Sequence, residues 1–223
     1  MRTSKPAAVL CAGALALLIL SASIAAPILI RPFYYLQIDA LELPQRTGWS
    51  RETIRAAYDQ VLDFCVLGRP FGAGELAWSE AGRSHFADVQ GLFWLDFAVA
   101  GGALLVLLAL LLLRRWRGFA FYRFLGRGPG FWAGSLTLAA VLVVGALAAL
   151  DFDRAFVVFH ALFFPGKDNW IFDPAADQII LVMPEVFFRN CALLIGGVLL
   201  LCCGALVAWD LRRRPAGRTA VPR

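Results

Sequence analysis

The sequence predicts an all-α integral membrane protein with four transmembrane helices and an extracytoplasmic cap. Its residues are 60% hydrophobic, and four long apolar runs cover about 8–30, 92–113, 131–150 and 186–209. Each run reaches the roughly 20 residues that a helix needs to cross a bilayer. The second run contains GGALLVLLALLLL, without the polar stripe that a helix on a soluble core carries. We therefore expect a single membrane domain over residues 1–223.

The placement of arginine predicts how the chain is oriented. Five arginines and no acid lie between the second and third runs, and arginines also fill the tail at 211–223. The connections at 31–91 and 151–185 hold more acids than bases. Because Lys and Arg are retained on the cytoplasmic side of a membrane, both termini are predicted to be cytoplasmic. The extracytoplasmic cap is then built from 31–91 and 151–185.

The net charge of +5 follows from this asymmetry and does not indicate nucleic-acid binding. A nucleic-acid-binding protein needs a basic folded domain with aromatic side chains that stack on bases, and the sequence shows none. The five cysteines predict no disulfide framework, because four of them lie inside spans and leave Cys65 alone outside.

The first run also has features of a secretory signal, since MRTSK precedes it and SASIAAP resembles a cleavage site. The run extends to Ile30, which is longer than the apolar part of a typical signal. We therefore expect an uncleaved span, with cleavage as the alternative. Leu10, before Cys11, is too large for a lipoprotein processing site, so the chain is not expected to be a lipoprotein itself.

In the first outer segment, Pro32 and Pro44 disfavour a continuous helix, and RPFYYLQIDALELP is predicted to be extended. Ser50 is a good N-cap for a helix that follows it. The apolar residues of this helix share one face by their three- and four-residue spacing. They are Ile54, Tyr58, Val61, Leu62 and Cys65. We expect that face to pack against other outer segments.

A further helix is predicted to begin after Ser79 and to continue without a breaker into the second span. His85 and Asp88 are three residues apart, so they lie on one face of this helix. Asp96 is about three turns further on and returns to within roughly 20° of His85. An ionisable group at that depth faces the protein interior or a wet cavity, and Asp96 could equally bond a neighbouring helix.

The second outer segment places another histidine at helical spacing from an acid. Asp153 and His160 are seven residues apart and share a face of a helix that the Pro-Gly pair of FFPGKDNW ends. A polar turn, KDNW, follows. Asp173-Pro174 has the N-cap and N1-proline arrangement that begins a helix, and Pro184 is predicted to bend the chain as it enters the fourth span.

The two histidines of the chain both fall just outside a span, on the predicted outer side. Histidine is the side chain that titrates unaided near neutral pH, and each histidine has an acid that could fix its tautomer. We therefore predict that His85 and His160 meet in one site. Acid–base chemistry on a lipid or a lipid-linked group is the activity that such a site would support.

Other catalytic templates are not supported. Two histidines with an Asp or Glu could bind zinc, but the sequence contains no HExxH or HxH motif. It also lacks the GxSxG motif and the P-loop and Rossmann glycine patterns. We therefore expect neither a metal nor a cofactor.

The two histidine segments resemble a family of small bacterial four-span membrane proteins, the lipoprotein intramolecular transacylase (Lit) family. The number and order of the spans agree over essentially the whole length. The matching residues are Ser79-Glu80, His85, Asp88-Val89, Phe159-His160, Phe163-Phe164, Asn169-Trp170, Phe172-Asp173, Pro184-Glu185 and Phe187-Phe188.

The resemblance implies an acyl shift within one substrate. A bacterial lipoprotein carries a diacylglyceryl group on its N-terminal cysteine, and the family enzyme moves the sn-2 acyl chain to the α-amino group of that cysteine. The product is an N-acyl, lyso-form lipoprotein. The implied partners are the diacylglyceryl-modified lipoprotein N-terminus and membrane lipid, and the implied location is the bacterial cytoplasmic membrane with the active site facing out. An ester-to-amide shift is downhill and needs no cofactor.

The resemblance makes His85 and His160 the catalytic candidates. His160 would take the proton of the amine, and His85 would polarise the ester carbonyl or protonate the leaving glycerol oxygen. The reverse assignment stays open. Asp88 and Asp153 would orient the two rings. The other supporting candidates are Asn169 and Glu185, which would bind the amine or the headgroup, together with Glu80 and Trp170.

Three alternatives belong to other classes of protein. A non-enzymatic four-span protein, such as a sensor or a complex subunit, would use the histidines structurally. A metal-dependent hydrolase would lose its activity with a chelator. A transporter is less favoured, because four spans with one intramembrane acid offer little of a pathway.

Overall fold

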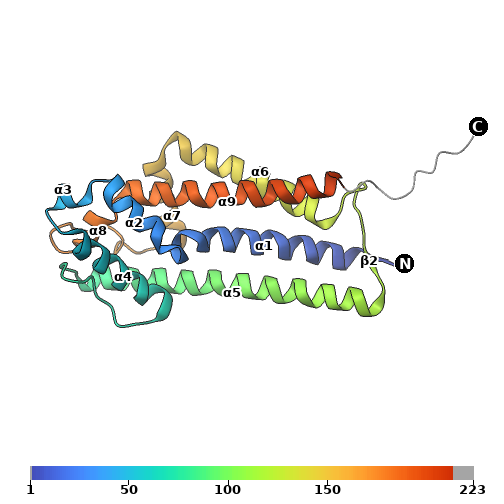
Figure 1. Ribbon diagram of the computed structural model, residues 1–223, viewed down its shortest axis with the longest axis horizontal. Helices are drawn as coiled ribbons and strands as arrows, with labels where there is room; N and C mark the ends of the chain where they lie inside the picture. The colour runs from blue at the N-terminus through green and yellow to red at the C-terminus, as the bar shows by residue number, and fades with distance from the viewer. Residues whose placement is uncertain (1, 213–223) are drawn as a thin grey trace, which may run out of the picture. The chain divides into compact units, whose positions relative to one another are not determined.

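The computed structural model describes residues 2–212, and these residues are mainly helical (Figure 1). Four helices are long and apolar enough to cross a membrane, namely α1 (Lys5–Leu29), α5 (Glu80–Arg117), α6 (Pro129–Leu150) and α9 (Glu185–Arg212). They coincide with the four predicted spans, so the predicted fold class is confirmed. Residues 213–223 of the predicted tail lie outside the described residues.

Helix α5 is longer than a membrane span requires. Its 38 residues correspond to a rise of roughly 57 Å, whereas the hydrocarbon core of a bilayer is about 30 Å thick. The helix begins where the sequence predicted, because the backbone N–H of Gly82 donates to the Ser79 hydroxyl oxygen at 3.0 Å. This cap satisfies one of the amide groups that a helix start leaves without a partner.

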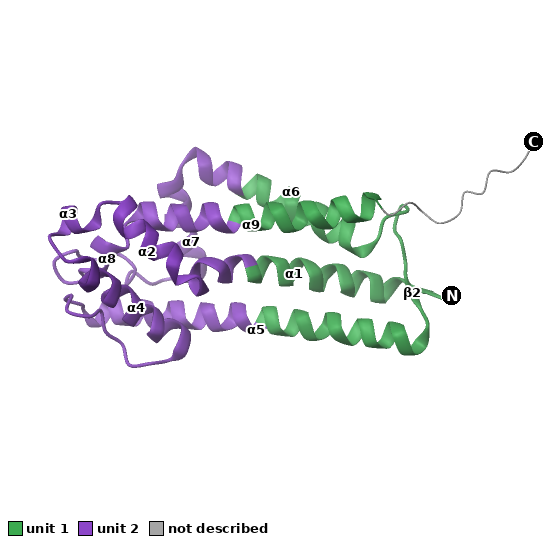
Figure 2. Cartoon of the chain, in the orientation of Figure 1, with its two compact units in different colours: residues 1–22, 99–144, 196–223 green, residues 23–98, 145–195 purple. Residues whose placement is uncertain are grey.

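The chain divides into two compact units (Figure 2). The first comprises Met1–Ala22, Val99–Val144 and Gly196–Arg223, and the second comprises Ser23–Ala98 and Gly145–Ile195. Both histidines, and every other residue predicted to belong to the site, fall in the second unit.

In the first unit, the start of the chain pairs with the loop that follows α5. Strand β1 (Thr3–Ser4) runs parallel to β2 (Ala120–Phe121). The carboxylate of Asp210, near the end of α9, is buried and accepts hydrogen bonds from Arg123 and from the backbone N–H of Gly128, both at 3.1 Å. The arginine-rich loop is thus tied to both the first and the last described segments. The sequence did not predict this sheet, because two residues per strand carry no readable period.

The second unit contains the shorter helices. They are α2 (Arg31–Ala40), α3 (Leu43–Thr47), α4 (Arg51–Leu67), α7 (Phe152–Phe163) and α8 (Ile179–Val182). Helix α4 buries Ile54, Tyr58, Val61, Leu62 and Cys65, and the Ser50 side chain accepts a hydrogen bond from the backbone N–H of Thr53. Both the predicted cap and the predicted buried face of this helix are confirmed.

Two stacked tyrosines lie at the centre of this unit. The ring of Tyr34 in α2 lies 3.7 Å from that of Tyr58 in α4, with only 10° between the ring planes. Phe187 packs edge-on against Tyr34 at 5.2 Å. The Tyr34 hydroxyl donates to the backbone carbonyl of Val182 in α8 at 2.7 Å. A single buried side chain therefore joins α2, α4, α8 and the start of α9.

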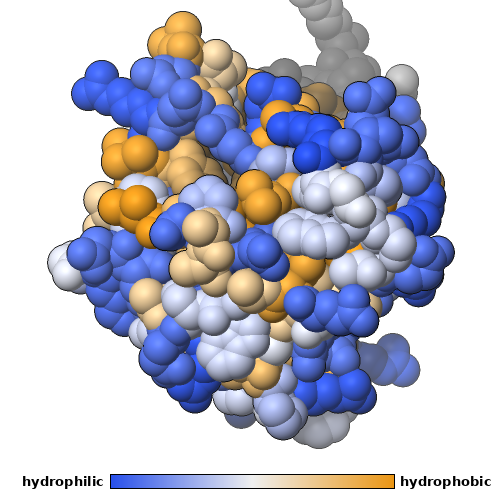
Figure 3. Space-filling view, turned by 90° about the vertical axis from the view of Figure 1, so that its left-hand side faces the viewer, coloured by the Kyte–Doolittle hydropathy of each residue, from blue (hydrophilic) through white to orange (hydrophobic). Residues whose placement is uncertain are grey.

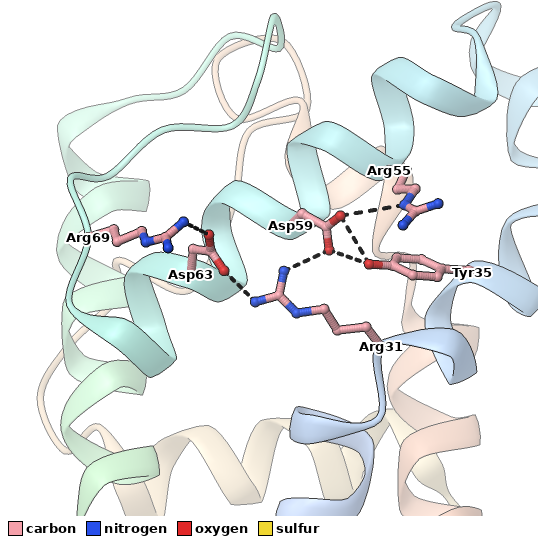
Figure 4. A network of polar contacts seen from close by, with 6 residues as sticks. All are labelled: Arg31, Tyr35, Arg55, Asp59, Asp63 and Arg69. Carbon is pink, nitrogen blue, oxygen red and sulfur yellow. Dashed lines mark hydrogen bonds and ion pairs between the residues drawn. The ribbon is translucent and has the colours of Figure 1, made fainter.

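A network of ion pairs joins α2 to α4 on the surface of the same unit (Figure 4). Arg31 donates to Asp59 at 3.0 Å and also contacts Asp63. The Tyr35 hydroxyl donates to Asp59 at 2.7 Å, and Arg69 pairs with Asp63 at 2.7 Å. The face of this unit that carries α3, α4 and α8 exposes many hydrophilic residues, with hydrophobic residues between them (Figure 3).

The prediction that residues 31–44 are extended is wrong, because they form α2 and α3. Pro32 and Pro44 each stand in the first turn of their helix. The amide that proline lacks has no partner within a helix at that position, and the fixed φ of proline suits the helix start. The two prolines therefore begin helices here, and the chain changes direction between them.

The prediction that a helix begins at Asp173-Pro174 is also wrong. The Asp173 carboxylate accepts a hydrogen bond from the backbone N–H of Ala175 at 2.9 Å and closes a turn. Helix α8 begins only at Ile179. An Asp side chain that binds the backbone two residues further on stabilises a turn as readily as it caps a helix.

We expect Tyr34→Phe to destabilise the protein, because it leaves the Val182 carbonyl without its donor while it preserves the stacking on Tyr58. An unpaired buried polar group costs roughly 1–3 kcal/mol, so the free energy of unfolding should fall by about that amount. Thermal unfolding of the purified protein in detergent measures the change. Tyr35→Phe, which removes only a half-buried bond to Asp59, is the control and should cost less. Equal unfolding temperatures for Tyr34→Phe and the native chain would contradict this account of the core.

Candidate active site

The second unit brings His85 of α5 and His160 of α7 side by side. Their ring centroids are 5.8 Å apart, with 31° between the ring planes. The two residues are 5% and 6% exposed. Burial disfavours the charged form of each ring, and two imidazolium ions this close would repel each other. The predicted meeting of the histidines is therefore observed, and the pair is suited to hold no more than one positive charge.

The backbone fixes the orientation of His160. Its Nδ1 lies 2.7 Å from the carbonyl oxygen of Phe156, one turn earlier in α7. A carbonyl can only accept, so Nδ1 carries the hydrogen in this contact and Nε2 of the neutral ring carries the lone pair. The indole of Trp170 stacks on the ring at 4.4 Å. Burial lowers the pKa of His160, and the hydrogen bond to Phe156 opposes this shift only in part.

The ring of His85 is held in place by packing against aromatic side chains. Phe164 and Phe172 meet its ring at centroid distances of 4.9 and 5.4 Å, both in an edge-to-face arrangement. Its Nδ1 is buried and has no hydrogen-bond partner among the residues that the structure describes. The ring is thus positioned by packing, and its Nδ1 is not committed to a protein group.

Beside the histidines, Asp88 is neutralised by Lys167, whose Nζ lies 2.5 Å from a carboxylate oxygen. The other oxygen of Asp88 accepts a hydrogen bond from Asn169 Nδ2 at 3.1 Å, and the Ser84 hydroxyl lies 3.4 Å from the same nitrogen. Asn169 Oδ1 is buried and unpaired within the described part of the chain. The amide of Asn169 is therefore oriented so that an acceptor stays available.

The remaining predicted residues lie in other surroundings. Glu80 is exposed and pairs with Arg83. Asp153 and Glu185 lie close to each other. The structure therefore brings Asp88, Asn169 and Trp170 to the histidine pair. It places Glu80 at the surface, and it places Asp153 and Glu185 near each other.

Sequence reasoning gave no role in this site to four residues that contact it, namely Lys167, Ser84, Phe164 and Phe172. Lys167 carried a usable signal, because it and Arg154 are the only cations in an acidic segment that has six carboxylates. A lone lysine in such a segment has carboxylate partners available. The two phenylalanines stood among the residues that match the family, but aromatic residues are frequent in this part of the chain and nothing in the pattern placed these two against His85.

The geometry combines a base with an open lone pair, a second imidazole beside it and an unpaired amide oxygen, all within aromatic walls. Within residues 2–212, no three His, Cys, Asp or Glu side chains gather in a way that could hold a metal ion. Fold and site together define an integral membrane protein with a buried pair of histidines.

Comparison with known families supplies the chemistry. Residues 9–188 match the family described as lipoprotein intramolecular transacylase Lit. The match covers most of the chain, so the chain belongs to this family of acyltransferases. A search of curated proteins found no match.

Solved structures of the membrane-integral lipoprotein intramolecular transacylase Lit from Bacillus cereus share the fold. One has a TM-score of 0.80 and 23% sequence identity, over 93% of this chain and 95% of that chain. Two others, in which a histidine is replaced by arginine or by alanine, have TM-scores of 0.75 at the same identity. They cover 93% of this chain in both cases, and 91% and 93% of the respective solved chains.

The lowered pKa of His160 predicts how the stability depends on pH. Below pH 6.5, the ordinary value, the unfolded chain binds a proton at residue 160 that the folded chain does not yet bind. Protons then favour the unfolded state, so stability falls as the pH drops from 6.5 toward the folded pKa. His160→Asn removes this contribution, and its amide nitrogen can still donate to Phe156. We expect thermal unfolding in detergent at pH 7.5 and 5.5 to show a smaller drop for the variant. An equal drop would contradict the lowered pKa.

Proposed function

We propose that the histidine pair moves the sn-2 acyl chain of a diacylglyceryl-cysteine to the α-amino group of the same cysteine. The product is an N-acyl, lyso-form lipoprotein. Membership of the family gives the reaction class, an intramolecular acyl transfer on a lipoprotein. The observation that carries the assignment of residues is the buried contact between His85 and His160. The proposed site faces out from the bacterial cytoplasmic membrane, where the substrate's acyl chains lie in the outer leaflet.

The first step is removal of a proton from the amine. An α-ammonium group has a pKa near 8 and must become neutral before its nitrogen can attack. The Nε2 lone pair of His160 is the proposed acceptor, because Nδ1 of this ring donates to Phe156. The orphaned Oδ1 of Asn169 is the proposed acceptor for a second N–H of the amine. Both groups would hold the nitrogen in position beside the ester.

The second step forms the C–N bond and breaks the bond between the carbonyl carbon and the glycerol oxygen. Attack places negative charge on the carbonyl oxygen, which needs a donor as it develops. His85 is the proposed donor. It then gives a proton to the glycerol oxygen and regains one from His160, which took it from the amine. From ammonium to amide, the nitrogen loses two protons, of which the glycerol oxygen gains one and water the other. Since both reacting groups belong to one cysteine, proximity supplies much of the rate.

The test of this proposal is mass spectrometry of a lipoprotein N-terminus in a host that lacks its own N-acylation enzymes. The native chain should produce the N-acyl lyso form. His160→Asn retains a nitrogen at the place of Nδ1 and loses only the atom proposed as base. Loss of a general base costs about 100-fold or more in rate, so the product should fall by at least that factor.

The amount of His160→Asn inserted in the membrane serves as the control, and product is normalised to it. A variant that inserts normally and still forms the product at the native rate would exclude His160 as the base. A histidine with a purely structural role would change the stability of the protein and leave the product per folded molecule unaltered.

A second prediction concerns the stacking of Trp170 on His160. After it takes a proton, His160 is a cation against the face of an indole, an interaction of roughly 1 kcal/mol. We therefore expect Trp170→Leu to lower kcat about fivefold, and Trp170→Phe to lower it less, as measured by initial rates of product formation. Trp78→Leu is the control, because Trp78 packs on Phe71 and is 43% exposed. Equal losses for the two leucine variants would mean that the stacking has no specific effect.

A further inference from the structure

Residues 167–178, which we call the strap, run antiparallel along the first turns of α5. At one end of the strap, Lys167 binds Asp88. In the middle, Phe172 lies edge-on against His85 at 5.4 Å. The other end reaches the residues that immediately precede α5. The strap therefore contacts α5 before, at and after its histidine.

The far end of the strap is held by Asp177, which is only 4% exposed. Its carboxylate accepts a hydrogen bond from the backbone N–H of Ser79 at 2.8 Å and another from the Ser79 hydroxyl at 2.7 Å. The neighbouring Gln178 makes two more bonds to Ala77, through its side-chain oxygen at 2.8 Å and its backbone N–H at 3.0 Å. Since Ser79 is the N-cap of α5, this cluster fixes the point at which the helix begins.

Gly82 shows how closely Asp177 approaches the helix. A Cβ atom at position 82 would lie 2.1 Å from Oδ1 of Asp177, far inside van der Waals contact. Glycine is thus required there by space, within a helix that would otherwise favour alanine. Gly82 and His85 are three residues apart and lie on the same side of α5. The strap consequently covers the side of α5 from which His85 projects.

His85 depends on this arrangement more than His160 does. Backbone hydrogen bonding orients His160, whereas the packing of Phe164 and Phe172 orients His85, whose Nδ1 has no partner among the described residues. Phe172 belongs to the strap. A shift of the strap along α5 would therefore change the position of one of the two rings that hold His85.

We propose that Asp177 is a positioning residue for acyl transfer, because it locks the strap to the start of α5 and so keeps Phe172 against the ring of His85. The proposal rests on the proposed function of His85. Asp177 binds no substrate itself. Its effect reaches the reaction through the strap residues that contact the histidine pair, above all Phe172 against His85.

The experiment compares Asp177→Ala with Asp173→Ala in the full-length membrane enzyme. Asp173 lies in the same strap, but its carboxylate binds Ala175 within the strap. A misplaced reacting group costs about 10- to 100-fold in rate. We expect Asp177→Ala to lower kcat by that factor with KM changed less than about threefold. Asp173→Ala should stay within about twofold of the native enzyme. Rates are normalised to folded, inserted protein.

Gly82→Ala tests the same contact from the other side. In the native background, its methyl group would displace the Asp177 carboxylate, so kcat should fall roughly as in Asp177→Ala. In the Asp177→Ala background the collision is absent, and the added methyl should cause no further loss. Asp177→Asn keeps the shape and one acceptor, and we expect it to retain most of the native kcat. If Asp177→Ala does not accumulate in the membrane, Gly82→Ala in the native background and Asp177→Asn decide the question.

Native kcat for Asp177→Ala, or an equal loss from Gly82→Ala in both backgrounds, would overturn the positioning role. A loss that appears only as less folded protein, with unchanged kcat per molecule, would also overturn it. Failure of the native chain itself to form N-acyl lyso product would instead reject the proposed function. The two failures are thereby distinguished in one set of measurements.

Discussion

The site depends on the burial of two imidazoles against each other. In water, each ring would titrate near neutral pH and both would carry a proton for part of the time. Removed from water and set 5.8 Å apart, the rings disfavour positive charge. Aromatic side chains around them keep the two rings 5% and 6% exposed. A neutral pair that can accept one proton is what the proposed acyl transfer from an ester to an amine requires.

The features predicted correctly from the sequence are those that show as a repeating pattern or as a local composition. The four spans follow from long apolar runs. Helix α4 follows from its cap at Ser50 and from a repeating apolar face. The encounter of His85 with His160 was predicted because both stand at the same end of their spans. That inference needed only the predicted topology, which places both histidines just outside a span and on the same side of the membrane.

The missed features involve contacts between segments that are distant in the sequence. Lys167 meets Asp88, and Asp177 meets Ser79, across about 80 and 100 residues. No local pattern encodes either pairing. The expectation from Pro32 and Pro44 failed for another reason, since proline disfavours the interior of a helix but is common in its first turn. The hydrogen bond from His160 to Phe156 could not be predicted either, because its acceptor is a main-chain carbonyl that every residue has.

Because α5 is continuous, it fixes the spacing between His85 and the apolar run that follows it. From His85 to residue 92, where the apolar run begins, the helix rises about 10 Å without interruption. The distance along the helix between this imidazole and the start of the apolar run is therefore fixed by seven residues. Insertion of one residue into that stretch would lift the ring by about 1.5 Å and turn it by roughly 100°. Adaptation to a thicker or thinner membrane would therefore require changes within the apolar run, with the seven residues between His85 and this run kept in number.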